Sequence, residues 1–144
     1  DLDYIHSVER ISKLSSVISI NGGVQLDLMG QENAESTGTR QLSGIGGQMD
    51  FLEGAYRSKG GKGFICINSS RVTKDGERKS NILATIPGGS TISAPRTMIQ
   101  YVATEYGIAS LSGKTLRERA EAMASIAHPD FREELMKYAR ENFK

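Results

Sequence analysis

The sequence predicts an α/β fold in which a mixed β-sheet is flanked by helices. Short runs rich in β-branched residues fill the first two thirds of the chain, whereas the last third has helical periodicity. One helical segment also lies between two of the strands, and this order of elements indicates a mixed sheet. The 144 residues are sufficient for one domain with its own core, so we treat residues 1–144 as a single unit.

The N-terminal part of the chain predicts a helix followed by a β-hairpin. Apolar residues at positions 4, 8 and 11 suit a short amphipathic helix within residues 1–16. Residues 17–20 are mostly β-branched and residues 24–28 alternate apolar and polar, so both are expected to be strands. The Asn-Gly-Gly turn at residues 21–23 would join them as a hairpin.

The middle of the chain combines glycine-rich loops with one helix and several strands. Residues 30–47 are polar and loop-like, and a loop of this length in a compact domain is usually functional or disordered. Residues 49–56 have helical spacing. Residues 64–67 form an apolar run that predicts a central buried strand, in which Cys66 would be an inert thiol. A hairpin tip is expected at residues 74–78, and further strands at residues 82–86, 91–93 and 99–104.

The last third predicts two helices. Residues 115–127 place apolar side chains on one helical face, and Thr115 with Glu118 suits a capping box at the start. Pro129 suits the first turn of a second helix over residues 130–142, with His128 at its boundary.

Composition excludes several classes of function. The 18 Lys and Arg balance 17 Asp and Glu, so there is no basic surplus for a nucleic-acid partner. No apolar run is long enough to span a membrane. The single cysteine cannot form an internal disulfide, which favours a reducing, cytoplasmic location. No His, Cys and Asp cluster has the spacing of metal ligands, so we expect no metal.

Two glycine-rich segments are candidates for binding an anion or a carbonyl oxygen. Residues 46–48 are either a turn before a helix or a pair of backbone N–H groups aimed at a reacting oxygen. Residues 59–62 are either a solvated turn or a pair of cations that meets a phosphate. Glu32 and Glu35 lie in the long loop, and we expect both to be solvated. From the residues alone, no catalytic nucleophile is supported.

The chain resembles the acetyl-CoA hydrolase/transferase family in several segments that follow one another in the family's order. They resemble the family patterns SINSALEVDLxGQ, NAES, SGxGGQxDF, SKGGK, YVVTEYGxAxLxGK and IAHPDFR. The matching segments are residues 19–31 (SINGGVQLDLMGQ), 33–36 (NAES), 43–51 (SGIGGQMDF), 58–62 (SKGGK), 101–107 (YVATEYG), 111–114 (LSGK) and 126–132 (IAHPDFR). Within the family, the sequence is most similar to the butyryl-CoA:acetate and 4-hydroxybutyrate CoA-transferases.

The resemblance implies a CoA-transferase-like fold of two related α/β halves with the active site between them. This chain is similar to the C-terminal half. The family's catalytic glutamate lies in a segment like GIxSEMxSDG upstream of the matched region, and no such segment occurs in the sequence. We therefore expect no catalytic residue in this chain, no activity of the chain alone, and the N-terminal half of the same enzyme as its partner.

The resemblance also implies which residues meet the substrate. Gly46, Gly47 and Gln48 would support the oxyanion side of the reacting thioester. Lys59 matches a CoA-contacting lysine, whereas Lys62 is added from charge and proximity alone. The expected CoA-binding residues are Val24, Ser43, Gly47, Lys59 and Lys62.

The implied reaction moves CoA between an acyl-CoA (butyryl-, 4-hydroxybutyryl- or acetyl-CoA) and a short-chain carboxylate such as acetate. It would proceed through a glutamyl-CoA thioester. CoA is then a substrate, and no covalently bound cofactor is expected. Two alternatives remain open: an acetyl-CoA hydrolase, and an isolated non-catalytic CoA-binding module. The sequence also leaves open a homo-oligomer.

Overall fold

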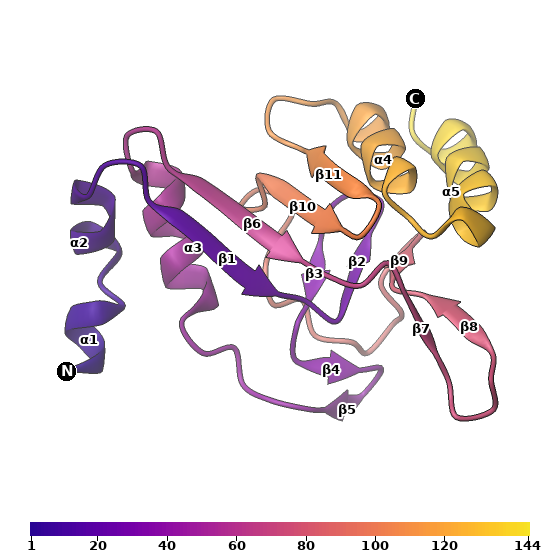
Figure 1. The fold of residues 1–144 in the computed structure, drawn as a ribbon, viewed down its shortest axis with the longest axis horizontal. Coiled ribbons are helices and arrows are strands. Elements are labelled where there is room, and N and C mark those ends of the chain that lie inside the picture. Colours follow the sequence, from indigo (N-terminus) through magenta and orange to yellow (C-terminus); the bar gives the residue numbers. More distant parts are fainter.

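The largest sheet of the computed structural model, which describes all of residues 1–144, has four strands in the order β1-β6-β10-β11 (Figure 1). Strands β1 (Ile18–Gly22), β6 (Lys62–Cys66) and β10 (Tyr101–Thr104) are parallel, and β11 (Gly107–Ser110) runs antiparallel to β10. The predicted mixed sheet is therefore confirmed, with β6 in a central position.

A second sheet corrects the predicted hairpin. Strands β2 (Gln25–Asp27), β3 (Glu32–Asn33) and β9 (Ile82–Leu83) form a three-stranded sheet in the order β3-β2-β9. The hairpin expected over residues 17–28 is wrong, because β1 pairs with β6 whereas β2 pairs with β3 and β9. The glycine turn leads the chain from one sheet into the other instead of folding it back.

Two small hairpins lie outside these sheets. Strands β4 (Ser36–Thr37) and β5 (Arg40–Gln41) form one, within the segment expected to be a loop. Strands β7 (Ser70–Val72) and β8 (Arg78–Ser80) form the other and confirm the predicted tip between them.

Two of the expected strands differ from the structure. The strand over residues 82–86 is limited to β9, and residues 91–93 form no strand. Near the latter segment, Ala94 makes a single bridge to Glu32, and the Ser93 hydroxyl is used for side-chain hydrogen bonds. This segment is thus held by the Ser93 side chain and one bridge, and not by a longer series of backbone hydrogen bonds between strands.

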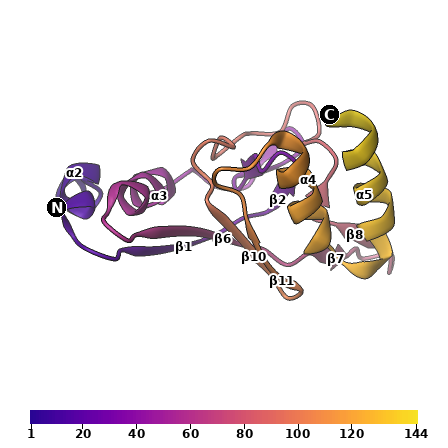
Figure 2. The same ribbon diagram turned by 90° about the horizontal axis from the view of Figure 1, so that it is seen from above.

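Helix α3 (Gln48–Arg57) packs on one face of β1 and β6, as Figure 2 shows, and confirms the helix predicted there. The helix expected within residues 1–16 is two short helices, α1 (Leu2–Ile5) and α2 (Val8–Lys13), and α2 packs against α3. A Cβ atom at Gly54 of α3 would lie 2.4 Å from Ile11 Cγ2, so the absence of a side chain there permits the close approach of α2.

The C-terminal helices α4 (Leu116–Ser125) and α5 (Pro129–Asn142) pack against each other, and α4 also packs against β11. Both predicted starts are confirmed. Thr115 and Glu118 form a reciprocal capping box, and Pro129 occupies the first turn of α5. His128 caps α5, because its Nδ1 accepts a hydrogen bond from the Asp130 N–H.

The hydrophobic core is one cluster that joins β2, α3, β6, β10, β11, α4 and α5. On β6 the alternation of side chains puts Ile65 into this core and Cys66 on the opposite face. Cys66 is therefore exposed, and the expectation of a buried thiol is wrong. None of the helices is both long enough and apolar enough to span a lipid bilayer.

Candidate functional site

A buried carboxyl group lies where the second sheet meets the start of α3. Glu32 of β3 is fully buried, and its Oε2 accepts a hydrogen bond from the Gln48 side-chain amide. Its Oε1 is also buried and has no hydrogen-bond partner. A Cβ atom at Gly23 would lie 2.9 Å from this oxygen, so the glycine backbone forms one wall of the carboxyl site.

Glu35 lies close by and is nearly as buried as Glu32. Its Oε2 accepts a 2.6 Å hydrogen bond from the Ser93 hydroxyl, and its Oε1 accepts one from the Gln41 amide at 3.3 Å. The buried Asn33 side chain shapes the turn between the two glutamates, because its Oδ1 accepts from the N–H groups of Glu35 and Ser36. The expectation that Glu32 and Glu35 are solvated is wrong.

The environment of Glu32 favours its neutral form. Burial raises the pKa of Glu32 to about 8, and the neighbouring Glu35 carboxyl adds to the rise, whereas the hydrogen bond from Gln48 opposes it. At neutral pH the group therefore mostly carries a proton. A buried neutral carboxyl avoids the large desolvation penalty of an unpaired charge.

Three residues of the expected site bond to the segment that carries these two carboxyl groups. The Val24 N–H donates to the Asn33 carbonyl at 2.9 Å, directly after the glycine turn. The Ser43 N–H donates to the Glu35 carbonyl at 3.2 Å, and Gln48 holds Glu32. The fold thus brings together Val24, Ser43 and Gln48, although they lie far apart in the sequence.

Gly46 and Gly47 precede α3 and face different surroundings. Gly46 is exposed and has a φ of 59°, a left-handed conformation that favours glycine. A Cβ atom at Gly47 would lie 2.4 Å from His6 Cε1, so the His6 ring rests on this glycine. His6 Nδ1 is also 3.4 Å from Asp50 Oδ2 in the first turn of α3.

Backbone N–H groups at the start of α3 are suited to donate hydrogen bonds to a ligand. Gly47 is the N-cap residue of the helix, and no side chain caps it. The first N–H groups of a helix have no partner within the helix, and the helix dipole favours negative charge at this end. The segment Gly46–Gly47–Gln48 can therefore stabilise an oxyanion or a carbonyl oxygen that gains negative charge.

Lys59 and Lys62 lie at the other end of α3. Both side chains are exposed, Lys59 in the turn that connects α3 to β6 and Lys62 as the first residue of β6. The Lys59 carbonyl accepts a hydrogen bond from the Ser16 N–H. The ten residues of α3 place these cations roughly 15 Å from the start of the helix. A ligand that meets both Gly47 and Lys59 must be elongated.

Apart from the buried carboxyl groups, a hollow lies at the carboxyl ends of the parallel strands β1, β6 and β10. Open α/β sheets commonly bind ligands at such a position. Its volume is about 420 Å³, and its lining includes Gly23, Cys66 and Glu105. Glu105 was not among the site residues predicted from the sequence. An acidic residue directly after a predicted strand was the signal that could have found it.

Glu105 is held as an ionised group at this hollow. Slight burial acts to raise the pKa of Glu105, but hydrogen bonds from the Ser69 hydroxyl and N–H, at 2.6 and 2.9 Å, leave it below its ordinary value. The nearby His128 also lowers the pKa of Glu105. No group of three or more His, Cys, Asp or Glu side chains is placed to hold a metal ion.

The family profile and three curated relatives of this chain all concern CoA-transferases or acetyl-CoA hydrolases. Residues 1–139 match the profile of the "Acetyl-CoA hydrolase/transferase C-terminal domain". The chain is 46% identical to the butyryl-CoA:acetate CoA-transferase of Anaerostipes caccae over 96% of this chain and 31% of that protein. It is also 46% identical to the 4-hydroxybutyrate coenzyme A transferase of Clostridium kluyveri, over 99% of this chain and 32% of that protein. The acetyl-CoA hydrolase of Eremothecium gossypii is 32% identical over 92% of this chain and 24% of its own length.

Solved structures show the same fold. RipA from Yersinia pestis superposes with a TM-score of 0.84 at 39% identity, over 96% of this chain and 30% of that one. A 4-hydroxybutyrate CoA-transferase from Porphyromonas gingivalis gives a TM-score of 0.76 at 40% identity, over 98% of this chain and 30% of that one. The chain spans about a third of the length of the first curated relatives it matches. By its family profile and these relatives, the chain belongs to the acetyl-CoA hydrolase/transferase family, whose C-terminal domain it matches.

Proposed function

We propose that this chain is the CoA-binding C-terminal part of a CoA-transferase. The enzyme would move CoA from an acyl-CoA, such as butyryl-, 4-hydroxybutyryl- or acetyl-CoA, to a carboxylate such as acetate. The names of the 46%-identical relatives support this substrate class. The observation that carries the proposal is the uncapped start of α3 at Gly46–Gly47–Gln48, next to the buried Glu32.

The proposed reaction begins when a glutamate from the N-terminal part of the enzyme attacks the thioester carbonyl. The C–S bond breaks, and an acyl-glutamyl anhydride and CoA thiolate form. The thiolate then attacks the glutamyl carbonyl, which releases the acyl group as a carboxylate and leaves a glutamyl-CoA thioester. An acceptor carboxylate repeats these two steps in reverse order and leaves with CoA.

The contribution of this chain is to stabilise charge and to position CoA. Each attack places negative charge on a carbonyl oxygen, and donors fixed at that oxygen stabilise the transition state. The N–H groups of Gly47 and Gln48 are suited to this task. The Glu32 hydrogen bond fixes the Gln48 side chain and with it the first turn of α3. CoA carries its phosphates far from its thiol, so its long arm suits the separation between Gly47 and Lys59.

Substitution of Gly47 tests the proposal in the full-length enzyme. Valine keeps the backbone N–H, but its side chain should displace the N–H groups of residues 47 and 48 from the reacting oxygen. We therefore expect Gly47→Val to lower kcat by about 10²–10³-fold, as much as the loss of one oxyanion donor. The fold should survive, because the three atoms nearest to the new Cβ all belong to the ring of His6, a partly exposed side chain that can turn away. Gly44→Val is the matched control, since it lies in the same loop with open space around its Cβ position. Normal turnover of Gly47→Val would contradict the assigned role.

Hydrolysis of acetyl-CoA is the second candidate function, which acetyl-CoA hydrolases among the relatives support. The two reactions differ only in the acceptor that releases CoA, which is water in one and a carboxylate in the other. Release of free CoA from acetyl-CoA, measured with and without butyrate, separates them. A transferase should form butyryl-CoA in preference to free CoA, whereas a hydrolase should be indifferent to butyrate.

A further inference from the structure

Strand β1 has its apolar side chains on the outside. Ile18 and Ile20 are 53% and 69% exposed, whereas Ser19 between them is only 6% exposed. Because successive side chains of a strand point to opposite faces, the two isoleucines share the face of the sheet that α3 does not cover. This pattern is the reverse of the one expected for a sheet whose second face is solvated.

The apolar character of this face continues across the sheet. Ile20 lies opposite Phe64, which lies opposite Tyr101, and the two aromatic rings stack with centroids 4.9 Å apart. In the next row, Cys66 and Ala103 lead to Ile108, which is 63% exposed. Figure 1 looks onto this open face, and no helix lies in front of it.

The outer edge of β1 is also unpaired. β1 is the terminal strand of its sheet. The Val17 carbonyl and the Gly23 N–H bond to β6, so the alternating groups of Ile18, Ile20 and Gly22 point outward. Proteins usually protect such an edge with Pro, Lys or a covering segment. Residues 18–22 contain neither Pro nor Lys.

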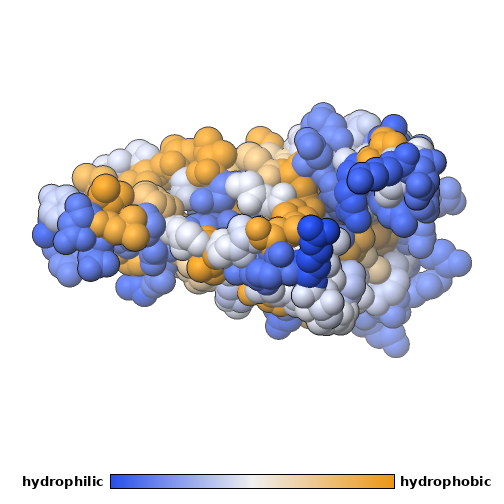
Figure 3. Space-filling model, turned by 90° about the horizontal axis from the view of Figure 1, so that it is seen from below, coloured by the Kyte–Doolittle hydropathy of each residue, from blue (hydrophilic) through white to orange (hydrophobic).

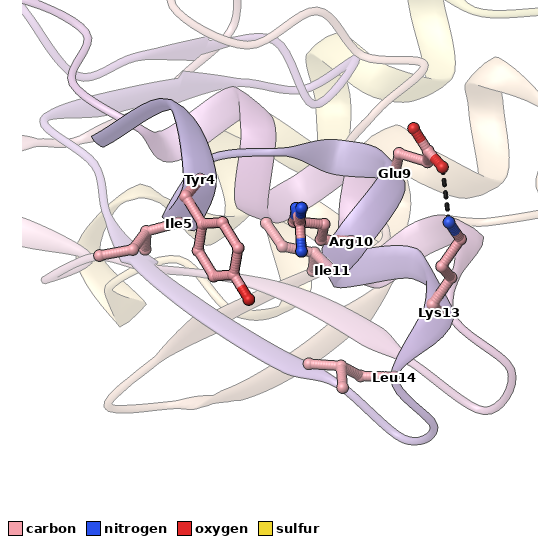
Figure 4. A pocket seen from close by; sticks show the side chains of 7 residues that line it. All are labelled: Tyr4, Ile5, Glu9, Arg10, Ile11, Lys13 and Leu14. Carbon is pink, nitrogen blue, oxygen red and sulfur yellow. Dashed lines mark hydrogen bonds and ion pairs between the residues drawn. The ribbon is translucent and has the colours of Figure 1, made fainter. Parts of the chain in front are cut away.

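Apolar side chains are also exposed on the N-terminal segment, whose helices α1 and α2 lie at the same end of the molecule as the start of β1 (Figure 1). Tyr4, Ile5 and Leu14 of the N-terminal segment are all largely exposed. With Arg10, which lies over the Tyr4 ring, they border a hollow of about 480 Å³ that Figure 4 shows from close by. Figure 3 shows apolar residues from near the N-terminal end to the middle of the molecule, while the end with α4 and α5 is mostly hydrophilic.

We propose that the free edge of β1, the open face of its sheet and the hollow under α1 and α2 together form the docking surface for the N-terminal region of the enzyme. That region adds a strand beside β1 and covers Ile18, Ile20 and Phe64. The inference rests on the proposed function, because it takes this chain to be one part of a longer transferase.

Two observations select this occupant. The first curated relatives are about three times as long as the matched segment, and the profile that matches is that of a C-terminal domain. The additional region therefore precedes this domain in the relatives. In this chain α1, α2 and β1 are the first three elements, and all of them contribute to the proposed docking surface.

Hydrogen exchange of single backbone amides tests strand addition. The 144-residue chain is compared with the full-length enzyme by NMR. We expect the N–H groups of Ile18, Ile20 and Gly22 to exchange at least 100-fold more slowly in the full-length enzyme. Ser19 and Asn21 face β6 and should be protected in both, which makes them the internal control. Equal exchange of the three outward amides in the two proteins would overturn the proposal.

A variant pair tests the surface by a second route. Ile20→Lys in the full-length enzyme should expose the tryptic sites between the two regions at lower urea concentration than in wild type. Val72→Lys, an exposed β-branched residue on the β7–β8 hairpin, should not. If the 144-residue chain instead forms a dimer in sedimentation that Ile20→Lys dissociates, and the full-length enzyme shows no protection, a second copy is the occupant and the proposal fails.

Acyl transfer measured on the same full-length sample separates the two proposals. Protection of the outward amides in an enzyme that transfers no CoA supports the docking surface and contradicts the proposed function. CoA transfer without that protection supports the function and contradicts the docking surface.

Discussion

The buried carboxyl group of Glu32 should make the stability of the fold depend on pH. Its pKa of about 8 in the folded chain exceeds the ordinary 4.5, so folding favours the protonated form. This stability is fully present below pH 4.5 and is lost as the pH rises through 8. Between pH 6 and pH 9 the chain should lose about 2–3 kcal/mol from this group. Glu32→Gln, which cannot ionise, should remove this loss in urea unfolding at the two pH values.

Glu134→Gln is the control for this titration, because Glu134 is exposed on α5. It should keep the wild-type difference between pH 6 and pH 9. If Glu32→Gln shows the same difference as Glu134→Gln, the Glu32 carboxyl is not held protonated by its burial.

Lys59 is proposed to bind the phosphate end of CoA, far from the reacting thiol. We expect Lys59→Ala in the full-length enzyme to raise KM for the acyl-CoA about fivefold with little change in kcat. An exposed cation–phosphate contact is worth about 1 kcal/mol and acts equally on the ground and transition states. Steady-state kinetics checks this, with Lys74→Ala at the β7–β8 tip as the control. An unchanged KM for the acyl-CoA would contradict the proposed contact between Lys59 and CoA.

The two buried glutamates show how far sequence reasoning reaches at the residue scale. Composition places acidic residues in solvent, and only the three-dimensional structure reveals that Asn33 and Ser93 hold the turn that buries Glu35 close to Glu32. For the glycine segment before α3, the local sequence left open a turn before a helix or a pair of backbone N–H groups aimed at a reacting oxygen. The contact between Gly47 and His6 was not predicted, because it joins positions 41 residues apart.

At the scale of elements, Gly54 determines how closely α2 packs on α3. A methyl group there would lie 2.4 and 2.6 Å from Cγ2 and Cβ of Ile11, a β-branched side chain that cannot easily turn away. Overpacking costs about 1–3 kcal/mol, and alanine returns about 1 kcal/mol of helix propensity. We therefore expect Gly54→Ala to loosen the docking of α2, measured as faster hydrogen exchange of the Ile11 amide.

The clash itself can be tested by a double-mutant cycle. In an Ile11→Ala background the crowding is relieved, so Gly54→Ala should become neutral or stabilising. The same destabilisation in both backgrounds would mean that crowding against Ile11 is not the cause.

Elements with local start signals were the predictable ones. The capping box of Thr115 and Glu118 and the position of Pro129 identify α4 and α5 without knowledge of the fold. Strand pairing was not predictable in this way. β1 lies beside β6, some 40 residues away, and the turn signal at residues 21–23 says only that the chain bends, not which strand it meets next.

At the scale of the whole molecule, the resemblance to a family supplied the overall fold, but not how distant segments are held together. Arg119 of α4 is a main connection. It is 8% exposed and donates to three carbonyls, those of Met29 at 2.9 Å, Leu111 at 2.8 Å and Arg96 at 2.7 Å. One side chain thus joins α4 to the β2–β3 turn, to the end of β11 and to the segment before β10.

Replacement of this arginine should therefore weaken the entire fold. Arg119→Met keeps much of the volume but leaves three carbonyls without their donor, while it also removes a costly buried charge. We expect a net loss of about 2–4 kcal/mol, seen as an equal shift of the urea midpoint by far-UV circular dichroism and by tyrosine fluorescence. Arg117→Met, two residues earlier in α4, removes only an exposed pair with Glu121 and should cost less than about 0.5 kcal/mol. Separate transitions for the two probes in Arg119→Met would show that the helices and the sheets unfold independently, and that Arg119 does not couple them.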